Sequence, residues 1–168
     1  MKIQRGSFWE ISNYIDDEIV FDEDDVYAGV TFNFFNCEKL KVTIPGKFKN
    51  FMLNKCKRIE LHIDSCVSMG EVIKCERVKL HIENVVPQVS IELSNGIQVY
   101  GTLESKNKIS LMTTASQSIS FIVPKDPGTF DPNNEEHDPN KTEVIPETYC
   151  SKYIDGKFTT VAEEGGFD

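Results

Sequence analysis

The fold is decided by three stretches that repeat every 19 residues: CEKLKVTI at 37–44, CKRIELHI at 56–63 and CERVKLHI at 75–82. In each stretch, every second residue from the fourth position onward is Leu, Ile or Val. Alternation of this kind predicts a β-strand with one buried face. Because the whole stretch recurs at a fixed interval, the strand belongs to a structural repeat.

The segment before each cysteine repeats at the same interval. Apolar residues recur at Phe34, Leu53, Val72 and Ile91, and a second series lies two residues earlier, at Phe32, Phe51, Gly70 and Val89. Two strands per 19 residues, with a turn near each cysteine, describe one coil of a β-solenoid whose coils stack about 4.8 Å apart. Weaker copies on both sides extend the array to about six coils, at residues 8–124. The predicted fold class is therefore an all-β parallel β-helix.

The rest of the chain has a different pattern, although we treat residues 1–168 as a single domain. Residues 125–142 are rich in Pro, Asn and acidic residues and predict a long mobile loop. In residues 143–168, the pair Asp155-Gly156 between two alternating runs predicts a β-hairpin. A lone hairpin is marginal in water. It must therefore dock, either on its own β-helix or on a second copy of the chain.

Composition and charge narrow the class of partner. The chain has a formal net charge of −9, and its longest basic cluster is Lys55, Lys57 and Arg58. Neither nucleic acid nor an anionic membrane is therefore expected as a partner. The first residues lack the apolar run of a signal peptide, and no stretch is long enough for a membrane span. We expect a cytoplasmic protein whose five cysteines are reduced thiols.

Motifs for catalysis, metal binding or cofactor binding are not evident. Cys37, Cys56 and Cys75 form a column best interpreted as packing, because zinc sites use close pairs of ligands. His62 and His81 stack on an outward face, and without a carboxylate or other third ligand they predict a solvated ladder. The acidic run from Asp22 lacks the glycine of a calcium-binding loop. We therefore predict no catalytic residue, no metal site and no cofactor, and a protein that is not an enzyme.

The outward residues of the first sheet form the candidate binding surface. They are Asn33, Met52, Glu71 and Ser90, with Phe35, Asn54, Ile73 and Glu92 beside them. Apolar side chains among polar neighbours favour a protein interface. The alternative is that these are scattered surface apolar residues, which are common in proteins.

Local motifs across residues 9–166 resemble one known family. They are PQVSI at 87–91, GIQVY at 96–100, ASQS at 115–118 followed by FIVP at 121–124, IPETY at 145–149, and DGKFTTV at 155–161. In this order they resemble the C-terminal actin-binding domain of cyclase-associated proteins, here as a short single-domain version.

The resemblance implies a right-handed β-helix that dimerises by exchanging the C-terminal hairpin. The residues expected to mediate dimerisation are Pro146, Tyr149, Tyr153, Ile154, Phe158 and Val161. It also implies binding to monomeric actin in its ADP form and acceleration of nucleotide exchange, so that actin monomers are recycled for the cytoskeleton. The residues expected to contact actin are Asn33, Met52, Asn54, Glu71, Ile73, Ser90, Glu92, Thr159, Thr160, Glu163 and Glu164.

Two alternative functions remain open at this point. The chain could sequester actin monomers without promoting exchange. It also resembles, less closely, the tubulin-cofactor-C-like β-helices, which activate GTPases through an arginine on the sheet. Arg58 or Arg77 would be that arginine here, since the two stack at the 19-residue period.

Overall fold

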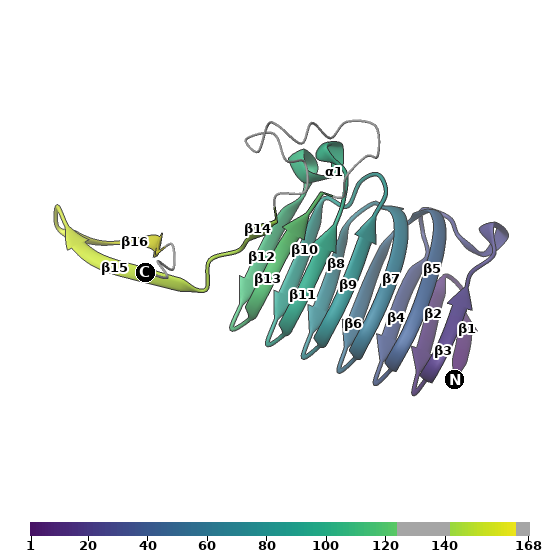
Figure 1. Cartoon of the computed structure of the whole chain (residues 1–168). Coiled ribbons are helices and arrows are strands. Elements are labelled where there is room, and N and C mark those ends of the chain that lie inside the picture. The colour runs from purple at the N-terminus through teal and green to yellow at the C-terminus, as the bar shows by residue number, and fades with distance from the viewer. Residues whose placement is uncertain (124–141, 164–168) are drawn as a thin grey trace, which may run out of the picture.

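A computed structural model describes residues 1–123 and 142–163 of the chain. Figure 1 shows a flattened solenoid made of two facing parallel sheets, from which a two-stranded hairpin extends at the C-terminal end. The predicted loop at 125–142 and the last five residues fall outside the described residues, apart from Thr142. In the described part of the chain, no helix is long and apolar enough to cross a membrane.

The two sheets alternate along the chain. The first sheet contains β1 (Lys2–Arg5), β2 (Phe8–Ser12), β4 (Thr31–Phe35), β6 (Asn50–Asn54), β8 (Met69–Ile73), β10 (Gln88–Glu92) and β12 (Ser110–Thr114). The second sheet contains β3 (Ile15–Val20), β5 (Glu38–Phe48), β7 (Lys57–Cys66), β9 (Glu76–Ile82), β11 (Asn95–Tyr100), β13 (Gln117–Ile122) and β14 (Glu143–Val144). A short 3-10 helix, η1 (Glu23–Asp25), and an α-helix, α1 (Leu103–Lys108), lie in connections.

The strand register confirms the 19-residue repeat. Phe32 pairs with Phe51, which pairs with Gly70, which pairs with Val89. In the second sheet, Leu61 of β7 pairs with Leu80 of β9. Six strand pairs, from β2–β3 to β12–β13, make six coils, as predicted.

Each coil turns at a residue with a left-handed backbone. This residue is Asn36, Lys55, Lys74 or Leu93 in four successive coils, with φ between 50° and 54°. The next residue is Cys37, Cys56, Cys75 or Ser94, and all four are buried. The Cys56 thiol donates to the Asn54 carbonyl at 3.4 Å, and the Ser94 hydroxyl donates to the Glu92 carbonyl at 2.8 Å. The cysteine column is therefore a packing and turn-closing column, which confirms its interpretation from the sequence.

Aromatic rings fill the N-terminal half of the core. The rings of Trp9, Phe21, Phe32, Phe48 and Phe51 contact one another edge to face in that order, with centroids 4.7 to 6.2 Å apart. Gly70 replaces an apolar side chain in the next coil, because a Cβ there would lie 2.1 Å from the Phe51 ring. Position 70 of this series is therefore glycine because the Phe51 ring occupies the space that a side chain would need.

Three elements were not predicted. β1 pairs antiparallel with β2 and covers the N-terminal edge of the first sheet, while β14 pairs antiparallel with β13 and covers the C-terminal edge of the second. Covered edges protect a sheet from pairing with other chains. The helix α1 begins at a reciprocal cap between Thr102 and Ser105, so the chain is nearly, but not entirely, all-β.

The predicted hairpin is confirmed. It consists of β15 (Thr148–Ile154) and β16 (Lys157–Glu163), paired antiparallel through a turn at Asp155 and Gly156. Both turn residues have positive φ, 50° and 82°, as a two-residue hairpin turn requires. Figure 1 shows the hairpin pointing away from the coils, joined to β14 by an extended segment.

Candidate functional site

The outward residues of the first sheet form straight columns. Asn33, Met52, Glu71 and Ser90 pair in register across β4, β6, β8 and β10. The neighbouring column is Phe35, Asn54, Ile73 and Glu92. The structure therefore brings the seven sheet residues predicted to contact actin, together with Phe35, onto one face. Their role in binding stays a prediction.

This face is continuous and chemically mixed. Met52 and Ile73 are half-buried between polar neighbours, whereas Phe35 is 42% exposed and lies 5.6 Å beneath the Lys55 ammonium. Met112 of β12 continues the Met52 column and is 54% exposed. Because parallel rungs hold each side chain in place, the face is rigid before any partner arrives.

The C-terminal residues predicted to contact actin lie elsewhere. Thr159 and Thr160 belong to the hairpin strand β16, and Glu163 is its last residue. Glu164 falls outside the described residues. Within the single chain, the hairpin residues are therefore not part of the sheet face.

A basic edge was missed by the reading of the sequence. Six exposed cations occupy the turns between the first and second sheets in three successive coils: Lys39, Lys55, Lys57, Arg58, Lys74 and Arg77. In the sequence they fall into separate groups: Lys55, Lys57 and Arg58, then Lys74 and Arg77, with Lys39 alone. Stacking of the coils brings these groups together, and overlaying the 19-residue repeats would have revealed the cluster. Glu38 and Glu76 pair with Lys57 at this edge, and the six cations still give it a net positive charge in an acidic chain.

Arg58 and Arg77 occupy a position set by the backbone. Both have positive φ, 53° and 57°, where the pairing between β5, β7 and β9 skips one residue. The equivalent position in other coils holds Lys39, Gly96 and Ser118, also with positive φ. The left-handed backbone at this position accepts several residue types and does not single out arginine.

The hairpin exposes apolar side chains on both faces. Tyr149, Tyr153 and Phe158 lie on one face, and Ile154 and Val161 lie on the other. All five are between 48% and 72% exposed. Tyr153 and Phe158 contact each other edge to face at 5.3 Å. Pro146, the remaining residue predicted to mediate dimerisation, is half-buried in the segment before β15.

The second sheet carries a cluster of titratable groups on its outward face. Glu60 and His62 lie two residues apart on β7, and His81 lies beside His62 on β9. His62 Nε2 is 2.7 Å and His81 Nε2 is 3.7 Å from Glu60 Oε1. The two imidazole rings are stacked, with centroids 4.2 Å apart and planes 5° from parallel.

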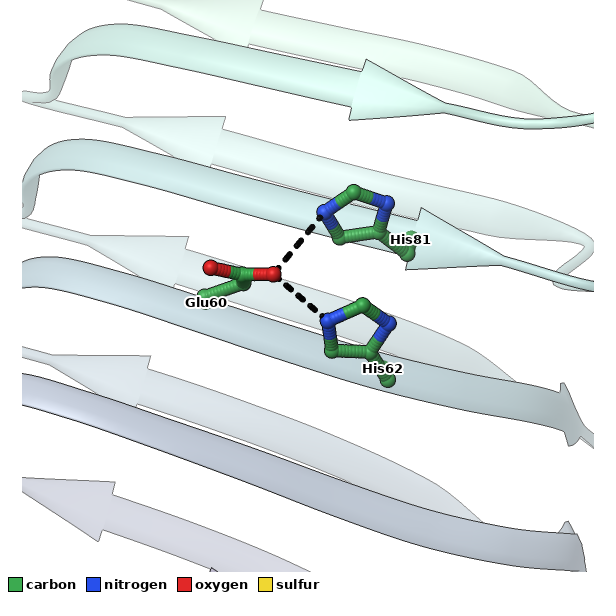
Figure 2. Close-up of side chains that lie close together, drawn as sticks. All are labelled: Glu60, His62 and His81. Carbon is green, nitrogen blue, oxygen red and sulfur yellow. Dashed lines mark hydrogen bonds and ion pairs between the residues drawn. The ribbon is translucent and has the colours of Figure 1, made fainter. Parts of the chain in front are cut away.

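The expectation that the histidine pair lacks a carboxylate is wrong. Glu60 reaches both rings, as Figure 2 shows. The hydrogen bond from His62 lowers the pKa of Glu60. Burial lowers the pKa of His81, because desolvation disfavours the imidazolium, and the neighbouring His62 acts in the same direction. The sequence could have shown this contact, because Glu60 and His62 are two positions apart on one strand and therefore lie on the same face.

Taken together, these features define a short parallel β-helix that offers sheet faces and a protruding hairpin as binding surfaces. Residues 1–164 match the protein-family model described as "Adenylate cyclase associated (CAP) C terminal", and the chain belongs to this family.

Similar proteins from distant organisms agree with this assignment. Cyclase-associated protein 1 of Arabidopsis thaliana is 27% identical over 161 residues, which cover 95% of this chain and 32% of that protein. The adenylyl cyclase-associated protein of Dictyostelium discoideum is 26% identical over 121 residues, which cover 71% of this chain and 25% of that protein. The chain thus spans about a third or less of these relatives.

A solved structure shares the fold. The crystal structure of the cyclase-associated protein from Cryptosporidium parvum superposes with a TM-score of 0.84, covering 97% of this chain and 94% of that one. Their sequences are 18% identical, so the likeness concerns the fold. The resemblance read from the sequence motifs is confirmed.

Proposed function

We propose that this chain binds monomeric actin in its ADP form and promotes exchange of the bound nucleotide. The observation that carries the proposal is the family match over residues 1–164. The chain would act as a binding module of the actin cytoskeleton, in which no bond of the nucleotide is made or broken by its residues.

The surface best suited to this role is the outward face of the first sheet. Actin presents a large folded surface, and a rigid face with apolar side chains among polar ones fits such a partner. Met52 and Ile73, in neighbouring columns, supply half-buried apolar side chains in the middle strands of the face. Glu71 and Glu92 add acceptors for cationic or amide groups of the partner.

Nucleotide exchange would be accelerated if the chain prefers one conformation of actin over another. A protein that binds a nucleotide-loose conformation more tightly than the closed one raises the population of the loose conformation. By linkage, it weakens nucleotide affinity by the same factor. A partner that binds both conformations equally sequesters actin without accelerating exchange, which is the alternative function.

We further propose that a second copy of the chain covers the hairpin. A two-stranded hairpin with exposed apolar residues on both faces is marginal alone. In the described part of the chain, β12 has a neighbour on one side only and is an open edge of the first sheet. Exchange of hairpins between two copies would cover both features with one two-fold interface.

Light scattering tests this dimer. We expect twice the mass of the 19.1 kDa chain for the intact protein, and the mass of one chain for a Tyr153→Ser, Phe158→Ser variant. Phe35→Ser, which alters an exposed phenylalanine of the coils, is the control and should leave the mass unchanged. A monomeric intact protein would refute the exchange.

Titration of labelled ADP-actin monomers tests the face. Met52→Asp should weaken binding at least about tenfold without lowering the melting temperature, because it replaces a half-buried apolar contact of the face with a charge. Gln98→Asp introduces the same charge at a half-buried outward position of the second sheet and is the matched control. Equal affinities for both variants and the parent would remove the first sheet from the interface.

A further inference from the structure

The cluster of Glu60, His62 and His81 stands apart from the proposed actin face, on the outward side of the opposite sheet (Figure 2). The ligand atoms that these three residues offer all lie within 4.8 Å of one another. Two are imidazole nitrogens and one is a carboxylate oxygen. This donor set is typical of sites for zinc and related divalent transition metals.

We propose that Glu60, His62 and His81 form a binding site for a divalent transition metal ion, with zinc as its representative. In a tetrahedral site with bonds of about 2.0–2.1 Å, ligand atoms lie about 3.3 Å apart. The distances from Glu60 Oε1 to the two Nε2 atoms, 2.7 and 3.7 Å, bracket this value. Because the two rings are stacked in parallel planes, they must also tilt toward each other for both Nε2 atoms to bind one ion.

The unsatisfied nitrogen of His81 points to the same location. His81 Nε2 is buried, and no described residue forms a hydrogen bond with it. The corresponding atom of His62 shares a hydrogen bond with Glu60. A metal ion between the three groups would take the place of the shared proton and would also bind the unpaired His81 nitrogen.

The neighbouring rungs hold the rings in position. Tyr100 pairs in register with His81 and stacks on it, with centroids 4.7 Å apart and planes 10° from parallel. The Tyr100 hydroxyl in turn donates to Gln98 Oε1 at 3.1 Å. Thr43 occupies the rung on the other side of His62. A site built on neighbouring strands keeps the three ligands close together, so that the tilt of the rings is the main change needed when the ion binds.

Two lysines limit the affinity of the site. Lys41 and Lys79 flank Glu60 in its own column, one on each side. Lys41 is partly engaged by Glu18 at 3.6 Å. A bound cation would be repelled by both ammonium groups, Lys79 more than Lys41. Removing the charge of Lys79 should therefore strengthen metal binding.

The donor set also predicts selectivity. Calcium takes six to eight oxygen ligands, and magnesium keeps several waters around an octahedral centre. This site offers a single carboxylate and two imidazoles, which suit softer transition metals. We expect zinc and cobalt to bind and calcium and magnesium not to compete.

Calorimetric titration of the full-length, untagged chain with zinc tests the proposal. We expect one zinc ion per chain, unaffected by excess magnesium or calcium. His81→Gln and Glu60→Gln should each weaken binding at least about tenfold, by loss of one ligand. Glu71→Gln removes the same charge on the opposite sheet and is the matched control. Lys79→Gln should bind more tightly than the parent, a result that damage to the fold cannot produce.

Cobalt absorption identifies the ligands directly. Cobalt bound by two imidazoles and a carboxylate gives visible bands without thiolate-to-metal charge transfer, whereas binding by cysteines gives strong charge-transfer bands. A rise in melting temperature with zinc that is lost in His81→Gln would support the site. Thiolate bands, or equal zinc affinity in His81→Gln, Glu60→Gln and Glu71→Gln, would overturn the proposal.

Discussion

The coils and the C-terminal hairpin are built from strands of similar composition but differ in what covers them. An inner strand such as β8 has a neighbour on each side and buries its inward side chains in one continuous core. Among the described residues, the hairpin strands pair only with each other in a sheet, and their aromatic residues are exposed. The same alternating pattern thus produces a self-sufficient repeat in one region and an incomplete element in the other. This difference is the reason for proposing that a second copy of the chain completes the hairpin.

The largest effect should come from the core phenylalanines. Phe32→Ala removes a ring in contact with Phe21 and Phe48, and should lower the free energy of unfolding by about 3–5 kcal/mol. Urea unfolding followed by the fluorescence of Trp9, the single tryptophan, measures it. Phe35→Ala, at an exposed position of the same strand, should cost less than about 1 kcal/mol.

The hairpin counterpart of this experiment is Phe158→Ala. If a second copy covers the hairpin, its effect on the Trp9 transition should depend on protein concentration. A loss as large as that of Phe32→Ala and independent of concentration would mean that the hairpin packs on its own coils. That result would contradict the proposal that the hairpin, unlike the coils, needs a second copy of the chain.

A smaller loss is expected from filling the glycine position in the core. Gly70→Val places a side chain against the Phe51 ring and should cost about 1–3 kcal/mol. The combined change with Phe51→Ala should cost less than the sum of the two, because the smaller residue makes room for the larger. Strict additivity in urea unfolding would show that the two positions do not share space.

Thiol reactivity should separate the regions chemically. In a Cys150→Ser variant, the remaining thiols, Cys37, Cys56, Cys66 and Cys75, are all buried in the coils. Burial raises the pKa of Cys66 to about 11, so little thiolate is present at neutral pH. We expect these four thiols to react with an aromatic disulfide reagent only when denaturant is added. Rapid reaction of a native thiol would contradict the packing column.

The smallest effect on stability should come from residues with a left-handed backbone, which occur in both the coils and the hairpin. Arg58→Gly at φ 53° relieves backbone strain but adds freedom to the unfolded chain. We therefore expect a gain of about 0.5 kcal/mol in urea unfolding. Gly96→Arg, the reverse change at the equivalent position, should lower stability. A loss for Arg58→Gly would indicate that the arginine side chain itself stabilises the coils.

Much of the fold could be predicted because the core imposes its period on the sequence. Leu61 and Leu80 occupy equivalent places in successive coils, so the 19-residue spacing is visible without a structure. The edge strands β1 and β14 carry no repeat, because each pairs antiparallel with one neighbour and has little buried surface. The helix α1 depends on a local cap and six residues, too short for a periodic pattern.

The candidate sites were predictable to different degrees. Alignment of Met52 with Asn33 and Glu71 followed from the repeat alone, and the register confirms it. The sequence predicts that Glu60 and His62 share a face, because they are two positions apart on a strand. The contact of Glu60 with both imidazoles depends on side-chain rotamers, which the sequence pattern does not give. The alternating pattern of the hairpin is the same whether it docks on its own coils or on a second copy of the chain, so the pattern predicts the hairpin but not its partner.

The most direct test of the proposed function is the release of a fluorescent ATP analogue from monomeric actin, with and without the 168-residue chain. We expect faster release with the parent protein, and loss of this acceleration in Met52→Asp but not in Gln98→Asp. Binding to actin with unchanged or slower release would contradict the exchange function and show a sequestering module instead.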